Sequence, residues 1–425
     1  MNVLTRTLAA TICGALALTA RAQSPFALKN GDRVVFYGDS ITDQRMYTLM
    51  AEQYIVTRFP NLRVSFVHSG WGGDRVTGGG GGPINVRLDR DVTAYKPTVV
   101  TVMLGMNDAS YRAFDDGIFA TYSSGYKHLV EKIQKDNPGV RLTLLQPSPY
   151  DDVTRPATFP GGYNATLLRY SAFVGQLATE QKAGVADLNA PVVAMLEKAN
   201  AADAVNAAKI IPDRVHPGWG GHLIMAEALL KSWNAPSLVS SVSIDAATGK
   251  ALAVNAKVGK VETGKDGTLS WSATEGSLPF PLGSPDANNA APYNLAVASS
   301  DFVEALDREM LSATGLASPR YTLKIDGKAI GEFGKEQLAA GVNLATLPTP
   351  MLSQALLVGK LTQLRASVHN SRWREYQVPQ SSDPQASQVL PALLNNLDAA
   401  DAPLTKAQRD AAKPRAHLFA LEPKG

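Results

Sequence analysis

The sequence predicts an α/β protein: a three-layer α/β/α unit in the N-terminal half and a mostly-β unit with added helices in the C-terminal half. From Arg33 to Trp233, short apolar runs alternate with amphipathic stretches of helical length. Glycine-rich or polar turns follow several of the apolar runs, as in βαβ units whose helices cover both faces of a parallel sheet. After Pro236 the pattern changes to short alternating runs, which predicts a separate unit.

Length and composition agree with this division. A chain of 425 residues is too long for one ordinary core, so we expect two or three domains. Apolar residues make up 45% and charged residues 19% of the chain, which is typical of a globular protein and not of a disordered or fibrous one.

The first residues have the pattern of a secretory signal peptide. Arg6 precedes an apolar run from Leu8 to Ala20, and Ala20-Arg21-Ala22 is a small-x-small triplet, so we expect cleavage after Ala22. The apolar run is too short to span a bilayer comfortably, and no later segment approaches the length needed. We therefore expect a secreted or periplasmic protein without a membrane span.

The cysteine, charged and histidine residues give no reason to expect a disulfide, a nucleic-acid partner or a bound metal. Cys13 is the only cysteine and lies in the signal, so the mature chain has no disulfide, which fits a large bacterial exported protein. Lys and Arg total 41 and Asp and Glu total 38, and Arg6 and Arg21 leave with the signal. The mature chain is thus nearly neutral, which gives no reason to expect nucleic acid as a partner. His216 and His222 do not have zinc-ligand spacing, so we expect neither metal nor cofactor.

Five strands and six helices are expected in the first unit. The strands are Arg33 to Tyr37, Val64 to His68, Thr98 to Leu104, Arg141 to Gln146 and Gly184 to Leu188. The helices are Tyr47 to Phe59, Asn85 to Tyr95, Tyr122 to Lys135, Asn164 to Lys182, Val192 to Asn200 and Gly220 to Trp233. This succession favours a flavodoxin-like sheet with its functional site at the carboxyl ends of the strands.

Four short blocks that follow expected strands together supply the parts of an acyl-transfer site. Ser40 would be the nucleophile, His216 the base, and Asp213 the carboxylate that orients the imidazole. The backbone N–H groups of Ser40 and Gly73 and the side-chain amide of Asn107 would form the oxyanion hole. Each block taken alone also fits a turn, a helix cap or a surface histidine, so the prediction rests on their combination.

These four blocks resemble those of the SGNH (GDSL-type) hydrolases, a family of esterases and lipases named for Ser, Gly, Asn and His. The resemblance covers residues 33 to about 233 and implies the same roles for the residues just named. Two features depart from the family pattern: His68 stands where asparagine is usual, and Gly72 is an alternative oxyanion donor to Gly73. The first block reads Gly-Asp-Ser-Ile-Thr, a variant similar to the carbohydrate-esterase branch.

Candidate substrate contacts lie in the loops around these blocks. They are Trp71, Arg75 and, in the loop of residues 147–162, Tyr150. Trp71 suits stacking on a sugar ring or, equally, packing its own loop. The run Gly78 to Gly82 lacks the Lys-Ser/Thr of a phosphate-binding loop, so we expect a flexible surface loop there.

The sequence predicts four segments: the signal peptide (1–22), the SGNH-type domain (23–236), a mostly-β accessory domain (237–348) and a helical segment (349–425) that packs on the preceding domains. A helix is expected at Phe302 to Leu311, hairpin turns at Gly264 to Gly267 and at Asp326-Gly327, and helix breaks at Pro391 and Pro403. The C-terminal half could bind carbohydrate or serve only to stabilise the protein.

The function expected from these features is a secreted serine esterase that removes small acyl groups, above all acetyl, from carbohydrate or another small ester. The absence of a long apolar segment that could serve as a lipid lid favours small acyl groups. One alternative is a lipase or lysophospholipase, and another is a non-catalytic polysaccharide-binding protein with a degenerate hydrolase domain.

Overall fold

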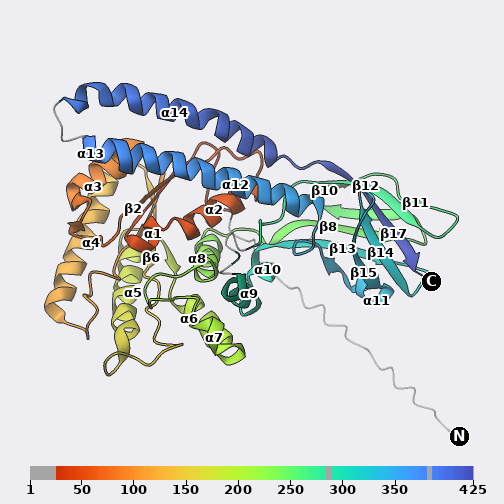
Figure 1. The fold of residues 1–425 in the computed structure, drawn as a ribbon, viewed down its shortest axis with the longest axis horizontal. Helices are drawn as coiled ribbons and strands as arrows, with labels where there is room; N and C mark the ends of the chain where they lie inside the picture. Colours follow the sequence, from red (N-terminus) through yellow and green to blue (C-terminus); the bar gives the residue numbers. More distant parts are fainter. Residues whose placement is uncertain (1–24, 284–286, 288–289, 381–384, 425) are drawn as a thin grey trace, which may run out of the picture.

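The computed structural model describes residues 25–283, 287, 290–380 and 385–424, so the expected signal peptide lies outside the described residues. Figure 1 shows three parts: an α/β unit, a β unit beside it, and a pair of long helices that runs along the α/β unit and reaches the β unit at one end. The C-terminus lies among the strands of the β unit, so the chain returns there after leaving the long helices.

A parallel five-stranded sheet forms the centre of the α/β unit. Its strands lie in the order β2-β1-β5-β6-β7, and every neighbouring pair is parallel, which confirms the flavodoxin-like prediction. Their bounds are β1 Arg33–Gly38, β2 Ser65–Gly70, β5 Val99–Met103, β6 Arg141–Gln146 and β7 Gly184–Asp187. The central strands β1 and β5 are almost wholly buried, because helices cover both of their faces.

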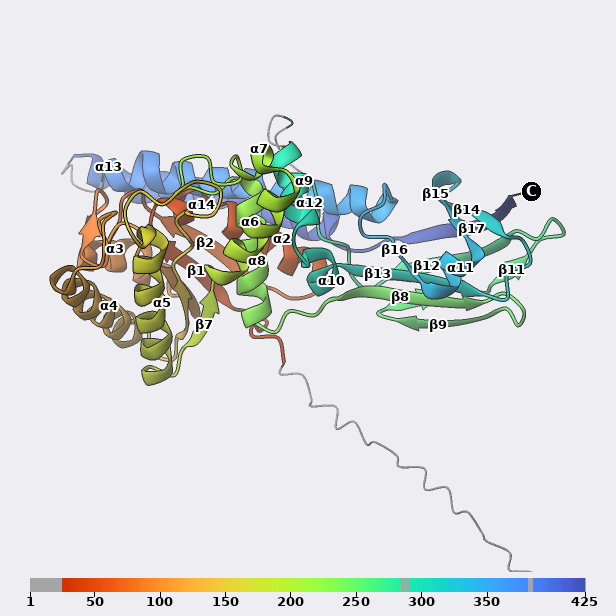
Figure 2. The same cartoon turned by 90° about the horizontal axis from the view of Figure 1, so that it is seen from below.

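Helices form the two outer layers of this unit. In Figure 2 the strands run between α5 on one side and α8 on the other. Helix α2 packs against α8, whereas α3, α4 and α5 contact one another in succession. The bounds are α1 Ser40–Asp43, α2 Met46–Arg58, α3 Ile84–Asp91, α4 Asp116–Asp136, α5 Gly162–Glu180, α6 Ala190–Ala202, α7 Ala204–Ala207 and α8 Trp219–Ser232. A single 3-10 turn, Thr93–Tyr95 (η1), follows α3.

The β unit contains two mixed or antiparallel sheets. One has the order β10-β12-β17-β14-β15 with β11 paired to β12, and the other has the order β16-β13-β8-β9. The strands are β8 Leu238–Asp245, β9 Lys250–Val254, β10 Ala256–Val258, β11 Glu262–Thr263, β12 Leu269–Glu275, β13 Arg308–Thr314, β14 Arg320–Ile325, β15 Lys328–Gly334, β16 Val342–Asn343 and β17 Ala416–Lys424. Both expected hairpin turns are present, between β11 and β12 and between β14 and β15.

The helix expected over Phe302 to Leu311 is wrong in its second half. Helix α10 covers only Phe302–Leu306, and Arg308–Thr314 is strand β13, parallel to β8. The residues of β13 alternate between buried and half-exposed positions as a strand requires. One of its buried positions is an acid, Glu309, which hides the apolar alternation in the sequence. Helix α11 (Lys335–Ala340) completes this unit, whereas α9 (Ala290–Ala298) packs against α6, α7 and α8 of the α/β unit.

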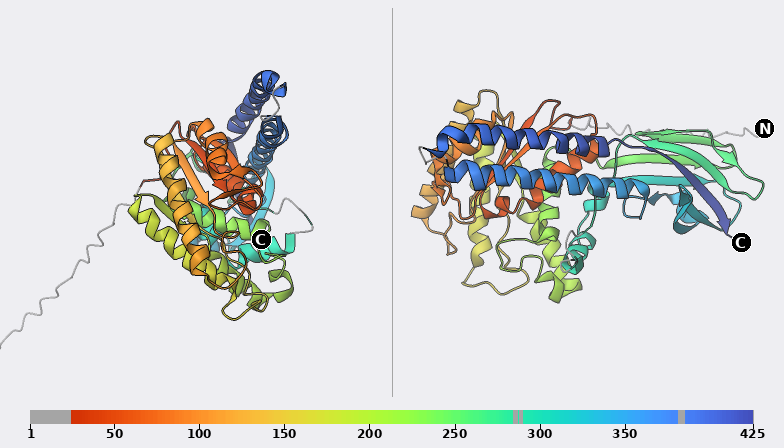
Figure 3. Two further views of the ribbon diagram at one scale, coloured as in Figure 1. Left: turned by 90° about the vertical axis from the view of Figure 1, so that its left-hand side faces the viewer. Right: turned by 45° about the horizontal axis from the view of Figure 1, so that its top comes forward.

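The C-terminal segment begins with the two long helices. Helix α12 (Pro350–Asn370) continues into a π-helical stretch, Ser371–Gln377 (η3), and the short helix α13 (Val378–Gln380). Helix α14 (Ala386–Ala411) lies beside α12 (Figure 3) and passes through Pro391 and Pro403 without ending. The expected breaks are therefore wrong. The carbonyl of Ala399, which Pro403 deprives of its helical donor, lies on an exposed residue that water can reach.

The expectation of a helical segment up to residue 425 also fails at its end. Residues Ala416–Lys424 form β17, which pairs with β12 on one side and β14 on the other. Phe419 stacks on Trp271 with ring centroids 5.6 Å apart, and Leu421 is fully buried. The strand lies between two neighbouring strands of the sheet. Pairing with these neighbours, and not the local pattern of the nine residues, makes this segment a strand.

Arg58 at the end of α2 joins the α/β unit to the β unit. Its guanidinium donates to the carbonyls of Pro236 (2.8 Å) and Leu306 (2.8 Å) and lies 3.4 Å from the Asp307 carboxylate. Because Arg58 and Asp307 are both buried, this ion pair fixes the linker and the β unit against α2.

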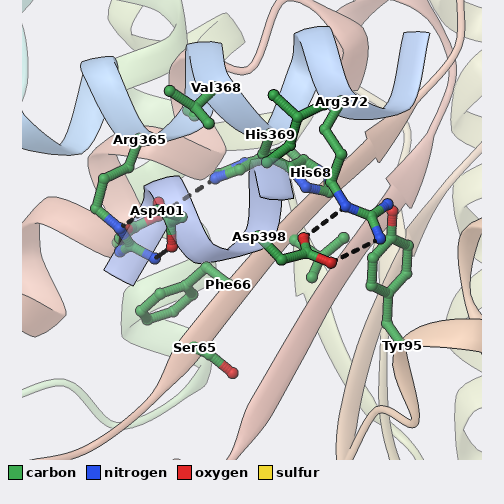
Figure 4. A pocket seen from close by; sticks show the side chains of 14 residues that line it. Ser65, Phe66, His68, Tyr95, Arg365, Val368, His369, Arg372, Asp398 and Asp401 are labelled. Carbon is green, nitrogen blue, oxygen red and sulfur yellow. Dashed lines mark hydrogen bonds and ion pairs between the residues drawn. The ribbon is translucent and has the colours of Figure 1, made fainter. Parts of the chain in front are cut away.

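The long helices dock on the edge of the parallel sheet. Arg365 on α12 donates to Glu52 on α2 (3.1 Å) and forms an ion pair with Asp401 on α14 (3.0 Å). A crevice of about 290 Å³ lies at this junction, and strand β2 supplies one wall. Figure 4 shows the ion pair of Arg372 with Asp398 in this crevice. Of the described residues that line the crevice, His68 alone belongs to the four blocks, and none is a predicted catalytic or oxyanion residue. Helix α12 is thus held to α2 by an ion pair that is largely buried and to α14 by a more exposed one.

We predict that the β unit loses stability as the pH rises, because it buries acids. Burial raises the pKa of Glu309 well above its usual range, and Glu275 and Asp307 nearby raise it further. The folded chain then holds a proton that the unfolded chain releases above pH of about 4, so unfolding becomes easier by about 1.4 kcal/mol per pH unit for each such proton as the pH rises toward the folded pKa.

The measurement is the thermal unfolding midpoint between pH 5 and pH 8. Glu309→Gln is expected to flatten the fall in the midpoint, because an amide does not titrate, while Glu304→Gln at an exposed position should leave it unchanged. A Glu309→Gln profile parallel to that of the wild type would contradict the prediction.

Candidate active site

Ser40, His216 and Asp213 form a continuous hydrogen-bonded row. Ser40 is the first residue of α1, directly beyond the carboxyl end of β1, and its Oγ lies 2.7 Å from His216 Nε2. His216 Nδ1 lies 2.6 Å from Asp213 Oδ2. The loop that carries both residues follows α7 instead of emerging directly from β7. In this arrangement the imidazole can accept the serine proton on one nitrogen while the carboxylate holds the other.

The Asp213 carboxylate is held in its charged form. Partial burial acts to raise its pKa, but the backbone N–H and the imidazole of His216, with the N–H of Val215, lower it below the usual value. Oδ1 accepts from the N–H groups of Val215 (2.9 Å) and His216 (2.7 Å), which leaves Oδ2 for the imidazole. A charged, oriented carboxylate stabilises the imidazolium that forms when the base takes a proton.

Gly73 and Ser40 offer backbone donors beside the nucleophile. The N–H of Gly72 is engaged, since it donates to Asp43 Oδ2 at 3.2 Å. Within the described chain, the N–H groups of Gly73 and Ser40 have no acceptor. Gly73 has φ of +77°, a left-handed conformation that favours glycine. Of the two glycines that the sequence offers as oxyanion donors, Gly73 is therefore the one whose backbone N–H is free to bind an oxyanion.

Asn107 presents the third donor and is held at both ends of its amide. Nδ2 donates to the carbonyl of Asp74 (3.0 Å), and Oδ1 accepts from the Tyr111 hydroxyl (2.9 Å). One Nδ2–H thus remains for a ligand, and the amide cannot rotate without losing both bonds. The sequence pattern gives no indication of this role for Tyr111. Its left-handed backbone, with φ of +54° next to Ser110 at +58°, is a signal that only the structure reveals.

Buried polar groups support the loop that carries the base. His222 Nε2 lies 3.1 Å from Gln44 Oε1, and Gln44 Nε2 donates to the carbonyl of Pro217 at 3.4 Å. Burial lowers the pKa of His222 to about 3, so its ring is neutral and serves as a hydrogen-bonding spacer. From the other side, Arg155 donates to the carbonyl of Ile211 (3.0 Å), just before the Asp213 turn.

The three predicted substrate contacts lie in different surroundings. Arg75 is exposed, with Nη1 3.4 Å from Ser110 Oγ. Tyr150 is half-buried and packs edge-on against Tyr111 and Tyr163. Trp71 is half-buried, and the guanidinium of Arg374 lies 3.4 Å from the centre of its ring. Trp71 therefore has the packing role that the sequence left open beside sugar stacking.

The glycine run at residues 78–82 has a structural role. It forms a small antiparallel ladder, β3 Gly78–Gly79 with β4 Gly82–Pro83, so the expected surface loop is a hairpin in which Gly79 and Gly80 are exposed. A Cβ at Gly81 would lie 2.6 Å from the Trp71 ring and 2.6 Å from the Arg87 side chain. Only glycine lets the backbone approach Trp71 this closely.

Two residues near this site come from the C-terminal segment and have no counterpart in the sequence analysis. Arg374 and Trp373 lie on η3 and contact the loop that begins at Trp71. The run Ser-Arg-Trp-Arg-Glu-Tyr at residues 371–376 concentrates arginine and aromatic residues, which is the only signal that could have drawn attention to it.

The described residues contain no cluster of three or more His, Cys, Asp or Glu side chains placed to hold a metal ion. No helix in the described part of the chain is both long and apolar enough to cross a bilayer.

Comparison with known proteins gives matches to a family model, to a curated relative and to solved structures. Residues 36–224 match the model of the GDSL-like Lipase/Acylhydrolase family. An acetylxylan esterase of Geobacillus stearothermophilus is 25% identical over 221 residues, which covers 48% of this chain and 94% of that protein. The structure of a gut microbial diltiazem-metabolizing enzyme superposes with a TM-score of 0.83 at 25% identity, over 95% of this chain and 100% of that chain. This last similarity includes the C-terminal half.

Proposed function

The domain that contains residues 36–224 belongs to the GDSL-like lipase/acylhydrolase family, and we propose that it is a serine esterase that removes small acyl groups, above all acetyl, from carbohydrate. The single observation that carries the proposal is the row Ser40 Oγ, His216 Nε2, His216 Nδ1 and Asp213 Oδ2, with successive distances of 2.7 and 2.6 Å across the two hydrogen bonds. The three free donors of Ser40, Gly73 and Asn107 complete the set of groups that ester hydrolysis needs.

The proposed reaction has two stages. Ser40 Oγ attacks the ester carbonyl while His216 Nε2 takes its proton, and the carbonyl oxygen becomes an oxyanion that accepts from the N–H groups of Ser40, Gly73 and Asn107. The tetrahedral intermediate collapses, His216 gives its proton to the leaving alcohol, and an acyl-Ser40 ester remains. Water then attacks this ester with the same base and donors, which releases the acid and restores Ser40.

One similarity supports an acetyl group on carbohydrate, and a second supports a wider range of small esters. The relative from Geobacillus stearothermophilus is named an acetylxylan esterase, and this chain covers almost all of it. The enzyme of similar whole-chain structure is named for diltiazem, so we propose that the chain also accepts small esters that are not carbohydrate.

We further propose that the protein is exported, on the signal pattern of residues 1–22.

Release of acetate from a panel of acetylated polysaccharides tests the substrate class. Acetylated xylan, other acetylated glycans and diltiazem are incubated with the wild type and with Ser40→Ala, and acetate and the remaining parent compound are measured. We expect release from acetylated glycan by the wild type alone. Acetate release by Ser40→Ala at the wild-type rate would contradict the proposal.

Nitrophenyl esters of increasing chain length separate the lipase alternative. An optimum at acetyl supports the proposal, whereas an optimum at long acyl chains would replace it with a lipase or lysophospholipase. The non-catalytic alternative requires that no ester in either panel is hydrolysed, although the serine, imidazole and carboxylate lie within hydrogen-bonding distance.

A further inference from the structure

We infer that Trp373 and Arg374, on the C-terminal segment, are positioning residues that hold the oxyanion loop of the distant α/β domain. The inference deepens the proposed function and rests on it. The oxyanion loop consists of residues 71–74, which follow β2 and include Gly73. Its two ends are fixed by the catalytic sheet, because Trp71 N–H donates to the carbonyl of Gly38 (2.9 Å) and the Asp74 carbonyl accepts from Asn107 (3.0 Å).

Arg374 contacts the loop on the side before Gly73. Its guanidinium lies 3.4 Å from the centre of the Trp71 ring and 3.6 Å from Asp43 Oδ2. The same Asp43 oxygen accepts the N–H of Gly72 at 3.2 Å. Asp43 closes α1, whose first residue is Ser40, so one carboxylate connects the nucleophile helix, the residue before Gly73 and Arg374. Stacking on Trp71 orients the guanidinium toward this carboxylate.

Trp373 reaches the loop on the side after Gly73, through two buried ion pairs. Its Nε1 donates to Asp91 Oδ1 at 2.6 Å, and Asp91 in turn accepts from Arg87. Arg87 Nε donates to Asp74 Oδ2 at 2.7 Å, and its Nη2 donates to the carbonyl of Ser69 at 3.0 Å. All four residues of this chain of contacts are buried, so water does not compete for their hydrogen bonds: Trp373, Asp91, Arg87 and Asp74.

Gly73 therefore lies between two anchored neighbours, Gly72 and Asp74. Its own N–H is free of acceptors in the described structure, and its left-handed backbone has no side chain to restrain it. Displacement of either neighbour would move this donor away from the oxyanion, whose binding depends on preorganised geometry. The C-terminal segment thus contributes to catalysis by fixing a donor and not by touching the substrate.

The local backbone of the C-terminal segment fits this role. Residues 371–377 form a π-helical turn at the point where α12 passes the oxyanion loop, and π-helical turns commonly occur at functional sites. The wider turn places two consecutive residues on the loop: Trp373 is buried edge-on against Trp71 at 5.6 Å, while Arg374 covers the ring face.

The experiment compares Arg374→Ala with Arg372→Ala in the full chain, using nitrophenyl acetate. Arg372 lies two residues away and forms an ion pair with Asp398 on α14. The Arg372→Ala variant therefore controls for a general disturbance of the C-terminal segment that leaves the contacts with the oxyanion loop in place. We expect Arg374→Ala to lower kcat by about tenfold or more with little change in KM, because an oxyanion donor acts chiefly in the transition state. Arg372→Ala should keep the wild-type kcat.

Two further variants keep the inference falsifiable if Arg374→Ala unfolds. Arg374→Lys retains the charge near Asp43 but not the planar stacking, so an intermediate kcat is expected. Trp373→Phe keeps the ring but removes the donor to Asp91, and a loss confined to kcat is expected as well. In the double variant Arg374→Ala/Asn107→Ala, the loss should be smaller than the product of the single losses, since both act on one oxyanion.

Equal kcat in Arg374→Ala, Trp373→Phe and Arg372→Ala would overturn the inference, as would losses that multiply in the double variant. Failure of the proposed function is recognised separately, because a wild type that hydrolyses no ester contradicts the esterase itself. In that case the rate at which a fluorophosphonate labels Ser40 decides the inference: slower labelling of Arg374→Ala than of Arg372→Ala supports it, and equal rates overturn it.

Discussion

Replacing Ser40 by alanine is expected to lower kcat for nitrophenyl acetate by about 10⁴-fold or more, since no other group can form the acyl intermediate. The hydroxyl is half-exposed at the carboxyl end of β1 and 2.7 Å from the imidazole of His216. Its loss leaves the oxyanion donors in place, so binding should change little and KM should remain near the wild-type value.

The matched control is Ser123→Ala. Ser123 is a half-exposed residue on α4 whose hydroxyl donates to the carbonyl of Ala120, so its loss should leave kcat unchanged. His216→Ala should lose about as much activity as Ser40→Ala, whereas Asp213→Ala should keep more, because its side chain is 55% exposed and water can take its place. Retained turnover in Ser40→Ala would remove the serine from the mechanism.

Replacing Asn107 by alanine is expected to lower kcat by about 10²–10³-fold, the usual effect of losing one oxyanion donor. The side chain is 9% exposed and is fixed by Asp74 and Tyr111, so its free N–H is preorganised. The effect should appear in kcat for every ester tested, because each forms the same oxyanion.

Asn85→Ala provides the comparison for this variant. Asn85 is an exposed residue whose amide oxygen bonds His128 on a helix surface, so kcat should not change. If Asn107→Ala turns over at the wild-type rate, the oxyanion is bound elsewhere and the roles of Gly73 and Asn107 must be revised.

The parallel sheet and the four blocks were predictable because they depend on local patterns. Each strand is a short apolar run, and a sheet of this topology brings the carboxyl ends of its strands to one edge whatever the packing in detail. Ser40, Gly73 and Asn107 all follow such ends, and their residue types reveal their chemistry without knowledge of their neighbours.

What the sequence did not reveal depends on contacts between distant segments. Arg374 lies far along the chain from Trp71, and nothing local indicates that a guanidinium will cover that ring. The sequence does not indicate strand β13, because the acid Glu309 occupies one of its core positions. Residues 416–424 form strand β17 because they pair with β12 on one side and with β14 on the other. In each case the decisive interaction is tertiary and overrides the local pattern.

The measurement that tests the central claim most directly is mass spectrometry of the protein during hydrolysis of nitrophenyl acetate. The reaction is quenched in acid at short times, and the peptide that contains Gly38-Asp39-Ser40 is examined in the wild type and in Ser40→Ala. A single acetyl group on Ser40 that appears and decays at the rate of turnover is the predicted result. Turnover with no acetyl on this peptide, or with acetyl on another residue at the rate of turnover, would contradict it.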